Sequence, residues 1–144
     1  VLDISSKPYT IYRPGAISAD EITEVIGKEV FQGSGSSKDE AAKSPGTKYS
    51  HYTPEAKVQW ISTSDTTFVH EAMYLMHSRP APRKSNRVIH YDGNFNKMAH
   101  ELYDRFRQAD HQQLYFVFVE PFSSEQRQKP IVQALQNRIS KAIG

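Results

Sequence analysis

Residues 114–119, an uninterrupted apolar run that reads Leu-Tyr-Phe-Val-Phe-Val, constrain the fold of this chain more than any other segment. A strand that is apolar on both faces has to be covered on both faces, so we expect it at the centre of a sheet. Helical periodicity predicts two helices near it, one over about 94–109 and one starting at Pro130. The chain has 144 residues, enough for one such core, and we expect a single α+β domain over 1–144.

Shorter elements are predicted before the central strand. Ser18 and Glu21 have the spacing of a capping box, which opens a short helix, and Gly27 stands where that helix ends. The other elements expected in this part are strands over 9–13 and 57–62, a helix over about 65–78 and a short strand over 87–91.

Two segments have the composition of loops. Residues 32–48 are rich in Gly, Ser and charged side chains, which is typical of a flexible loop. Residues 79–87 contain prolines and four basic side chains, Arg79, Arg83, Lys84 and Arg87. This basic loop is most simply a solvated surface. A contact to nucleic acid, to a phosphoinositide or to an acidic partner is the weaker alternative, because no stacking aromatic residues are interleaved and no nucleic-acid motif is present.

Composition excludes several classes of protein. The chain has no Cys, so neither a disulfide scaffold nor a thiolate metal site can form. The net charge of +2 is too small to indicate a nucleic-acid partner. His70 and His77 lack the spacing of a zinc-protease helix, and we expect no metal. No apolar run is long enough to span a membrane and no signal peptide is visible; a first residue Val1 indicates a processed product or an excised piece.

Polar side chains stand at the ends of two of the predicted strands. Arg13 ends the first, and Ser62 ends the second about fifty residues later, with Thr63 and Ser64 directly after it. The planar guanidinium of arginine pairs with phosphate oxygens through two parallel hydrogen bonds, and hydroxyl groups suit a sugar. The two strand ends together therefore indicate a site for an anionic ligand that carries a ribose.

These motifs and their order resemble the cholera-toxin-like mono-ADP-ribosyltransferases. That family opens with a strand ending in Tyr-Arg, matched by Tyr12 and Arg13, and continues with a Tyr-x-His element, matched by Tyr49 and His51. An aromatic-hydrophobic-Ser-Thr-Ser strand follows in the family, and residues 60–64 match it. The resemblance implies an ADP-ribosyltransferase-like split β core with flanking helices.

The resemblance also implies NAD as the substrate and assigns roles to the matched residues. Arg13 would contact the phosphates or the ribose of NAD, and Ser62 would orient the nicotinamide ribose. Thr63 and Ser64 would hold the strand corner, and His51 would assist near the ribose. The catalytic Glu-x-Glu of the family is not found, which leaves two glutamates as candidates, Glu120 and Glu125.

Two functions follow from the resemblance. The first is a glycosyltransferase activity of the secreted toxin or effector type, in which a virulence protein transfers ADP-ribose from NAD to a host target protein. The second is a catalytically inactive effector with the same fold that acts by binding a host protein. Because of the absent glutamate, whether the chain is an enzyme stays open. We expect a monomer with no membrane span and no nucleic-acid partner.

Overall fold

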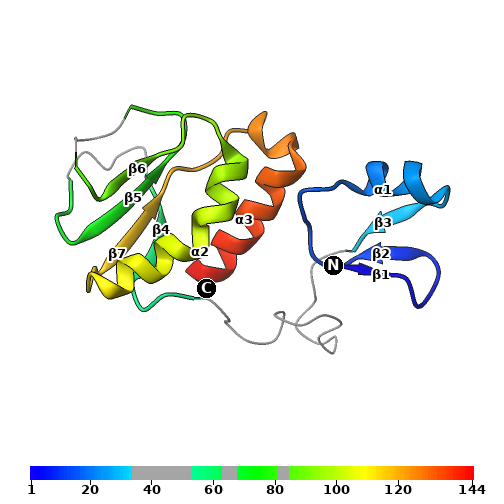
Figure 1. The fold of residues 1–144 in the computed structure, drawn as a ribbon, viewed down its shortest axis with the longest axis horizontal. Coiled ribbons are helices and arrows are strands. Elements are labelled where there is room, and N and C mark those ends of the chain that lie inside the picture. The colour runs from blue at the N-terminus through cyan, green and yellow to red at the C-terminus, as the bar shows by residue number, and fades with distance from the viewer. Residues whose placement is uncertain (34–52, 63–67, 81–84) are drawn as a thin grey trace. The chain divides into compact units, whose positions relative to one another are not determined.

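The structure is a computed structural model and describes residues 1–33, 53–62, 68–80 and 85–144 (Figure 1). Its elements are, in chain order, β1 (Leu2–Asp3), β2 (Tyr9–Ile11), α1 (Ala19–Ile26), β3 (Val30–Gln32), β4 (Lys57–Trp60), β5 (Ala72–Met76), β6 (Val88–His90), α2 (Phe95–His111), β7 (Phe116–Val119), the 3-10 helix η1 (Gln126–Gln128) and α3 (Pro130–Ile143).

The chain divides into two compact units. The first comprises Val1–His51 and Ser124–Asn137, and the second comprises Tyr52–Ser123 and Arg138–Gly144. Compactness does not decide whether the units fold independently, so the expected single domain over 1–144 stays a prediction.

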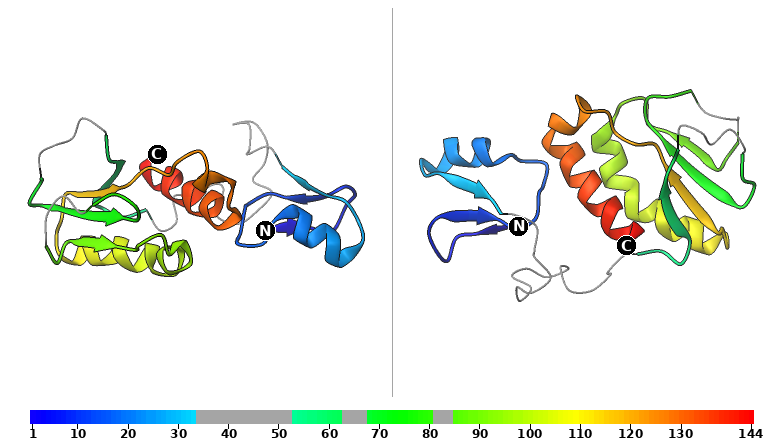
Figure 2. Two further views of the ribbon diagram at one scale, coloured as in Figure 1. Left: turned by 90° about the horizontal axis from the view of Figure 1, so that it is seen from above. Right: turned by 180° about the vertical axis from the view of Figure 1, so that it is seen from behind.

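A four-stranded parallel sheet of order β4-β7-β5-β6 forms the second unit. The apolar run of residues 114–119 supplies β7, which pairs with β4 on one side and β5 on the other, so its predicted central place is confirmed. Val58, Val117 and Met73 lie in one row across these three strands, and all are 2% exposed or less. Figure 2 shows α2 along one face of this sheet.

The two faces of β7 differ. Val117 and Val119 are fully buried, whereas Phe116 and Phe118 are half-buried and pack with the β5 residues Ala72, Tyr74 and Met76. The ring of Tyr74 stacks on Phe118, with 5.2 Å between centroids. The second face is therefore an aromatic layer.

The helix predicted over 65–78 is wrong, because the described part of this segment forms β5. Apolar residues at helical spacing suggested a helix, but Tyr74 and Leu75 between them are apolar as well, and all five residues of β5 are buried. A short continuous apolar run belongs to a parallel strand that is covered on both faces. The expected ADP-ribosyltransferase-like split β core is also wrong, since the larger sheet is parallel throughout, with helices flanking it.

The first unit carries a small sheet of order β1-β2-β3. β1 is antiparallel to β2, and β2 is parallel to β3, with α1 in the connection between them. The capping box of α1 is confirmed: Ser18 caps the backbone N–H of Glu21, and the Glu21 carboxylate accepts from the backbone of Ser18. Gly27 ends the helix with φ at +63°, a conformation that favours glycine. No residue of α1 is buried.

The remaining predicted elements are confirmed with small shifts of their ends. They are the strands at β2, β4 and β6 and the helices at α2 and α3. Within the described ranges, no helix combines the length and the apolar character needed to cross a bilayer. Most of the predicted loop over 32–48 lies outside the described residues.

Candidate functional site

The carboxyl ends of the parallel strands bring a group of polar residues together. His77, Ser78 and Arg79 follow β5, and Glu120 follows β7, its neighbour in the sheet. Open parallel sheets bind ligands at this edge in most α/β proteins. The carboxyl edge of this sheet is therefore the first place where a site is expected.

The carboxylate of Glu120 is 2% exposed and accepts hydrogen bonds from three consecutive backbone N–H groups. Its Oε2 accepts from His77 at 2.6 Å and from Ser78 at 2.9 Å, and its Oε1 accepts from Arg79 at 3.0 Å. Successive backbone N–H groups that converge in this way form a concave site for an anion. Here the anion comes from the chain itself, and the Nε of Arg79 adds a cation 3.9 Å from Oε1.

The imidazole of His77 is buried beside this carboxylate, with 1% of the residue exposed. Its ring stacks on Phe122 at 4.9 Å between centroids. Nε2 lies 3.2 Å from the backbone carbonyl of Glu120, which can only accept, so Nε2 carries the proton. Nδ1 then accepts from the hydroxyl of Ser78 at 2.8 Å. Burial lowers the pKa of His77 and keeps the ring neutral, although the nearby Glu120 acts in the opposite direction.

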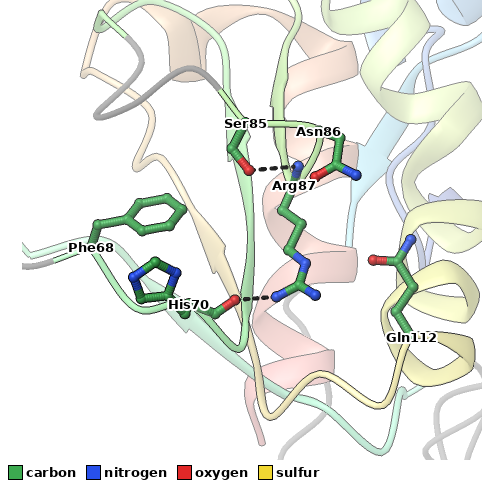
Figure 3. Close-up of a pocket in the computed structure, with 6 residues that line it drawn as sticks. All are labelled: Phe68, His70, Ser85, Asn86, Arg87 and Gln112. Atoms are coloured by element: carbon green, nitrogen blue, oxygen red, sulfur yellow. Dashed lines mark hydrogen bonds between the residues drawn. The ribbon is translucent and has the colours of Figure 1, made fainter.

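A depression of about 530 Å³ lies at the opposite edge, where the strands begin. It is lined by residues from three connections, namely Phe68, His70, Ser85, Asn86, Arg87 and Gln112. Figure 3 shows the side chain of Arg87 reaching between the backbone carbonyl of His70 and the side chain of Gln112. The guanidinium Nη1 donates to that carbonyl. The described lining of this depression therefore presents one cation, two amides and two rings.

The residues expected from the sequence are distributed between the units. Arg13 is half-buried in the first unit, where its carbonyl accepts from the amino group of Val1 at 2.6 Å. Ser62 is exposed in the second unit, shortly after β4. His51, Thr63 and Ser64 lie outside the described residues.

The two candidate glutamates have opposite environments. Glu120 is buried and held by backbone N–H groups, whereas Glu125 is exposed at the start of η1 and caps nothing with its side chain. A site role for Arg13, Ser62, Glu120 or Glu125 stays a prediction. The sequence reasoning did not anticipate His77, because the helix assigned to its segment hid the fact that a polar residue follows a buried strand there. Among the described residues, no three or more His, Asp and Glu side chains are grouped to hold a metal ion.

Comparison with known proteins points to one family. The family model of the threonylcarbamoyl-AMP synthase C-terminal domain matches residues 17–144. The threonylcarbamoyl-AMP synthase of Pyrococcus abyssi (strain GE5 / Orsay) is 42% identical over 60 residues, which is 40% of this chain and 17% of that protein. The crystal structure of P. abyssi Sua5 complexed with L-threonine superposes on 99% of this chain with a TM-score of 0.69 and 25% identity. This chain covers 44% of that solved chain.

These matches overturn the expectations that came from the toxin resemblance. The chain is not an ADP-ribosyltransferase, so NAD as its substrate and the two toxin or effector functions are wrong. The matched family consists of tRNA-modifying enzymes, so the expectations of secretion, of virulence, of a host target protein and of no connection to nucleic acid are wrong as well.

The family model and the solved structure match most of this chain, but the chain covers only part of each relative. The family model takes in all of the four-stranded sheet and its helices, together with α1 and β3 of the first unit. The chain nonetheless spans less than half the length of either relative, so it corresponds to a part of those proteins. The chain belongs to the family of the threonylcarbamoyl-AMP synthase C-terminal domain.

Proposed function

We propose that this chain takes part in the synthesis of threonylcarbamoyl-AMP as the C-terminal part of such a synthase, in the service of tRNA modification. The observation that carries this proposal is the family match over 17–144, supported by the similarity to the threonine-bound P. abyssi structure over 99% of the chain. Enzymes of this family use L-threonine, bicarbonate and ATP. The product joins a threonine carbamate to the phosphate of AMP.

Within this reaction the chain has a supporting role rather than that of the bond-forming site. The buried carboxylate at the carboxyl edge, Glu120, is engaged by three backbone N–H groups, and the imidazole beside it is engaged on both nitrogens. Neither group is available to activate threonine or to hold a triphosphate without rearrangement. This engagement favours a part that binds or positions over one that performs adenylyl transfer.

A chimaera tests the proposal directly. This chain replaces the matching part of P. abyssi Sua5, and the product is followed by mass spectrometry with pyrophosphate release as a second readout. The chimaera is expected to form threonylcarbamoyl-AMP only when threonine, bicarbonate and ATP are all present. The truncated P. abyssi protein without any replacement is the control. A chimaera that unfolds cooperatively but makes no more product than the truncated control contradicts the proposal.

A further inference from the structure

Within the described residues, Arg87 at the amino edge has no ion-pair partner. Its guanidinium donates to the backbone carbonyl of His70, and within the described part of the chain this is the one hydrogen bond recorded for that group. A carbonyl fixes the orientation of the guanidinium but supplies no negative charge. None of the described residues that line the depression is acidic. The remaining N–H donors of Arg87 therefore suit an anionic ligand, above all the planar oxygens of a phosphate.

Polar groups of both kinds surround this cation. The side chains of Asn86 and Gln112 each offer a donor pair and an acceptor, and Figure 3 shows them on the side of Arg87 away from the rings. A ligand that carries both donors and acceptors on one edge, such as a nucleobase or a ribose, can satisfy such amides. An anion that only accepts hydrogen bonds can pair with the amide N–H groups but not with the amide oxygens.

Two rings complete the lining on the other side of Arg87. His70 is exposed, and its ring meets that of Phe68 edge to face, with 5.6 Å between centroids. The Phe68 ring is stacked in turn on the ring of Tyr74, with 5.1 Å between centroids, and this contact restricts its movement. Fixed aromatic surfaces of this type contribute to the binding of planar bases by stacking.

The usual position for a phosphate in a parallel sheet is closed in this unit. The three convergent N–H groups of residues 77–79 already hold the carboxylate of Glu120. A ligand phosphate at the carboxyl edge would have to displace a buried charge. Among the described residues that line the amino-edge depression of about 530 Å³, no carboxylate competes for Arg87, and the volume lies in the range of small-ligand sites.

We propose that the amino-edge depression binds a nucleotide unit. Arg87 holds its phosphate, the rings of Phe68 and His70 contact its base, and the two amides hydrogen-bond its polar edge. The same chemistry is offered by a free nucleotide and by one nucleotide of a single-stranded RNA. Since the residues named all lie in this chain, occupancy of the depression is measured as binding and does not depend on synthase activity.

The test is a calorimetric titration of the full chain with AMP, adenosine and ribose 5-phosphate, accompanied by amide chemical-shift mapping. AMP is expected to bind more tightly than adenosine or ribose 5-phosphate, and the amide chemical-shift changes are expected to centre on residues 68–70, 85–87 and 112. Arg87→Gln is expected to lower the affinity for AMP at least about tenfold, because a hydrogen bond to a charged group is lost. The affinity for adenosine, which has no phosphate, is expected to stay unchanged. His70→Ala, at an exposed position, is expected to lower the affinity for adenosine severalfold.

The matched control is Arg79→Gln, which removes the same charge at the carboxyl edge and is expected to change AMP affinity less than about twofold. A single-stranded adenine hexanucleotide distinguishes the two sources. If it competes with AMP and binds more tightly, the ligand is RNA; if AMP binds and the oligonucleotide does not compete, the ligand is a free nucleotide. The proposal is overturned if the unaltered chain binds neither AMP nor the hexanucleotide saturably at millimolar concentration. It is also overturned if Arg87→Gln and Arg79→Gln lower the affinity for AMP equally, in variants that keep the melting temperature of the unaltered chain.

Discussion

Removal of the Glu120 side chain is expected to destabilise the second unit strongly. The carboxylate is 2% exposed and accepts three backbone N–H bonds between 2.6 and 3.0 Å, so solvent cannot replace it without opening the loop after β5. Hydrogen bonds to a charged group each contribute roughly 1.5–3 kcal/mol, and three that share one acceptor are not additive. Removing one partner of a buried charged network costs about 3–5 kcal/mol, which is our expectation for Glu120→Ala. Typical domains have a total stability of only about 5–15 kcal/mol.

Glu120→Gln isolates the charge from the volume. One amide oxygen can still accept from two N–H groups, but the NH₂ group then faces the third N–H as a second donor. We expect a loss of about 2 kcal/mol, from one unsatisfied buried donor and the lost charge. Glu125→Ala is the matched control, because Glu125 is exposed and its side chain caps nothing, and its expected effect is within about 0.5 kcal/mol.

The assay is urea unfolding followed by the fluorescence of Trp60, the single tryptophan of the chain, which lies in β4 and packs edge to face against Phe122. This probe reports on the second unit, where the perturbation acts, and the unfolding free energies follow from linear extrapolation. Millimolar acetate provides a further check, since a small carboxylate can enter the vacated site and is expected to raise the midpoint of Glu120→Ala selectively. Equal midpoints for the Ala variants at 120 and 125 would refute the role assigned to the buried carboxylate.

Three further predictions follow from other residues. Because burial lowers the pKa of His77, the unfolded chain binds a proton more readily than the folded one. The contribution of the neutral His77 to the free energy of unfolding is therefore fully present above the ordinary histidine pKa of about 6.5 and is lost as the pH falls below it. His77→Gln is expected to reduce the change of the urea midpoint between pH 7 and pH 5. Ser18→Ala removes one of the two hydrogen bonds that lower the pKa of Glu21 and keeps the larger one, from the backbone, so NMR titration should show that pKa rising only part of the way to its ordinary value. Leu75→Ala, at a fully buried position of β5, is expected to cost about 2–5 kcal/mol in the same urea assay, and a value near zero would mean that this strand is not in the core.

Local signals in the sequence predicted the elements whose causes are local. The capping box of Ser18 and Glu21, the glycine stop at Gly27 and the stripe of α2 each depend on residues within a few positions, and each is confirmed. The pairing of β7 between β4 and β5 depends on residues far apart, yet the continuous apolar run predicted its central place. Burial on both faces leaves a sequence signature of its own.

The segment of β5 shows where apolar patterns fail to distinguish a helix from a strand. Residues 72–76 are apolar at every position, so a helical stripe can be drawn through them as readily as a buried strand. That choice removed one strand from the predicted sheet, and it moved His77 from the carboxyl edge of a strand to the end of a helix. The depression at the amino edge was equally out of reach, because its lining comes from three connections that only the strand order brings together.

The failed resemblance has a physical cause as well. An arginine after one strand and hydroxyl residues after another are common where strands end, because the chain leaves the core there and its polar groups need solvent or hydrogen-bond partners. What distinguishes a transferase is a carboxylate that is free to face the sugar. In this chain the glutamate after the central strand is buried, and its charge holds the loop after the neighbouring strand through three N–H groups. A carboxylate bound so completely by its own backbone stabilises the fold, and among the described residues Arg87 at the opposite edge is a cation in a depression with no acidic side chain in its described lining.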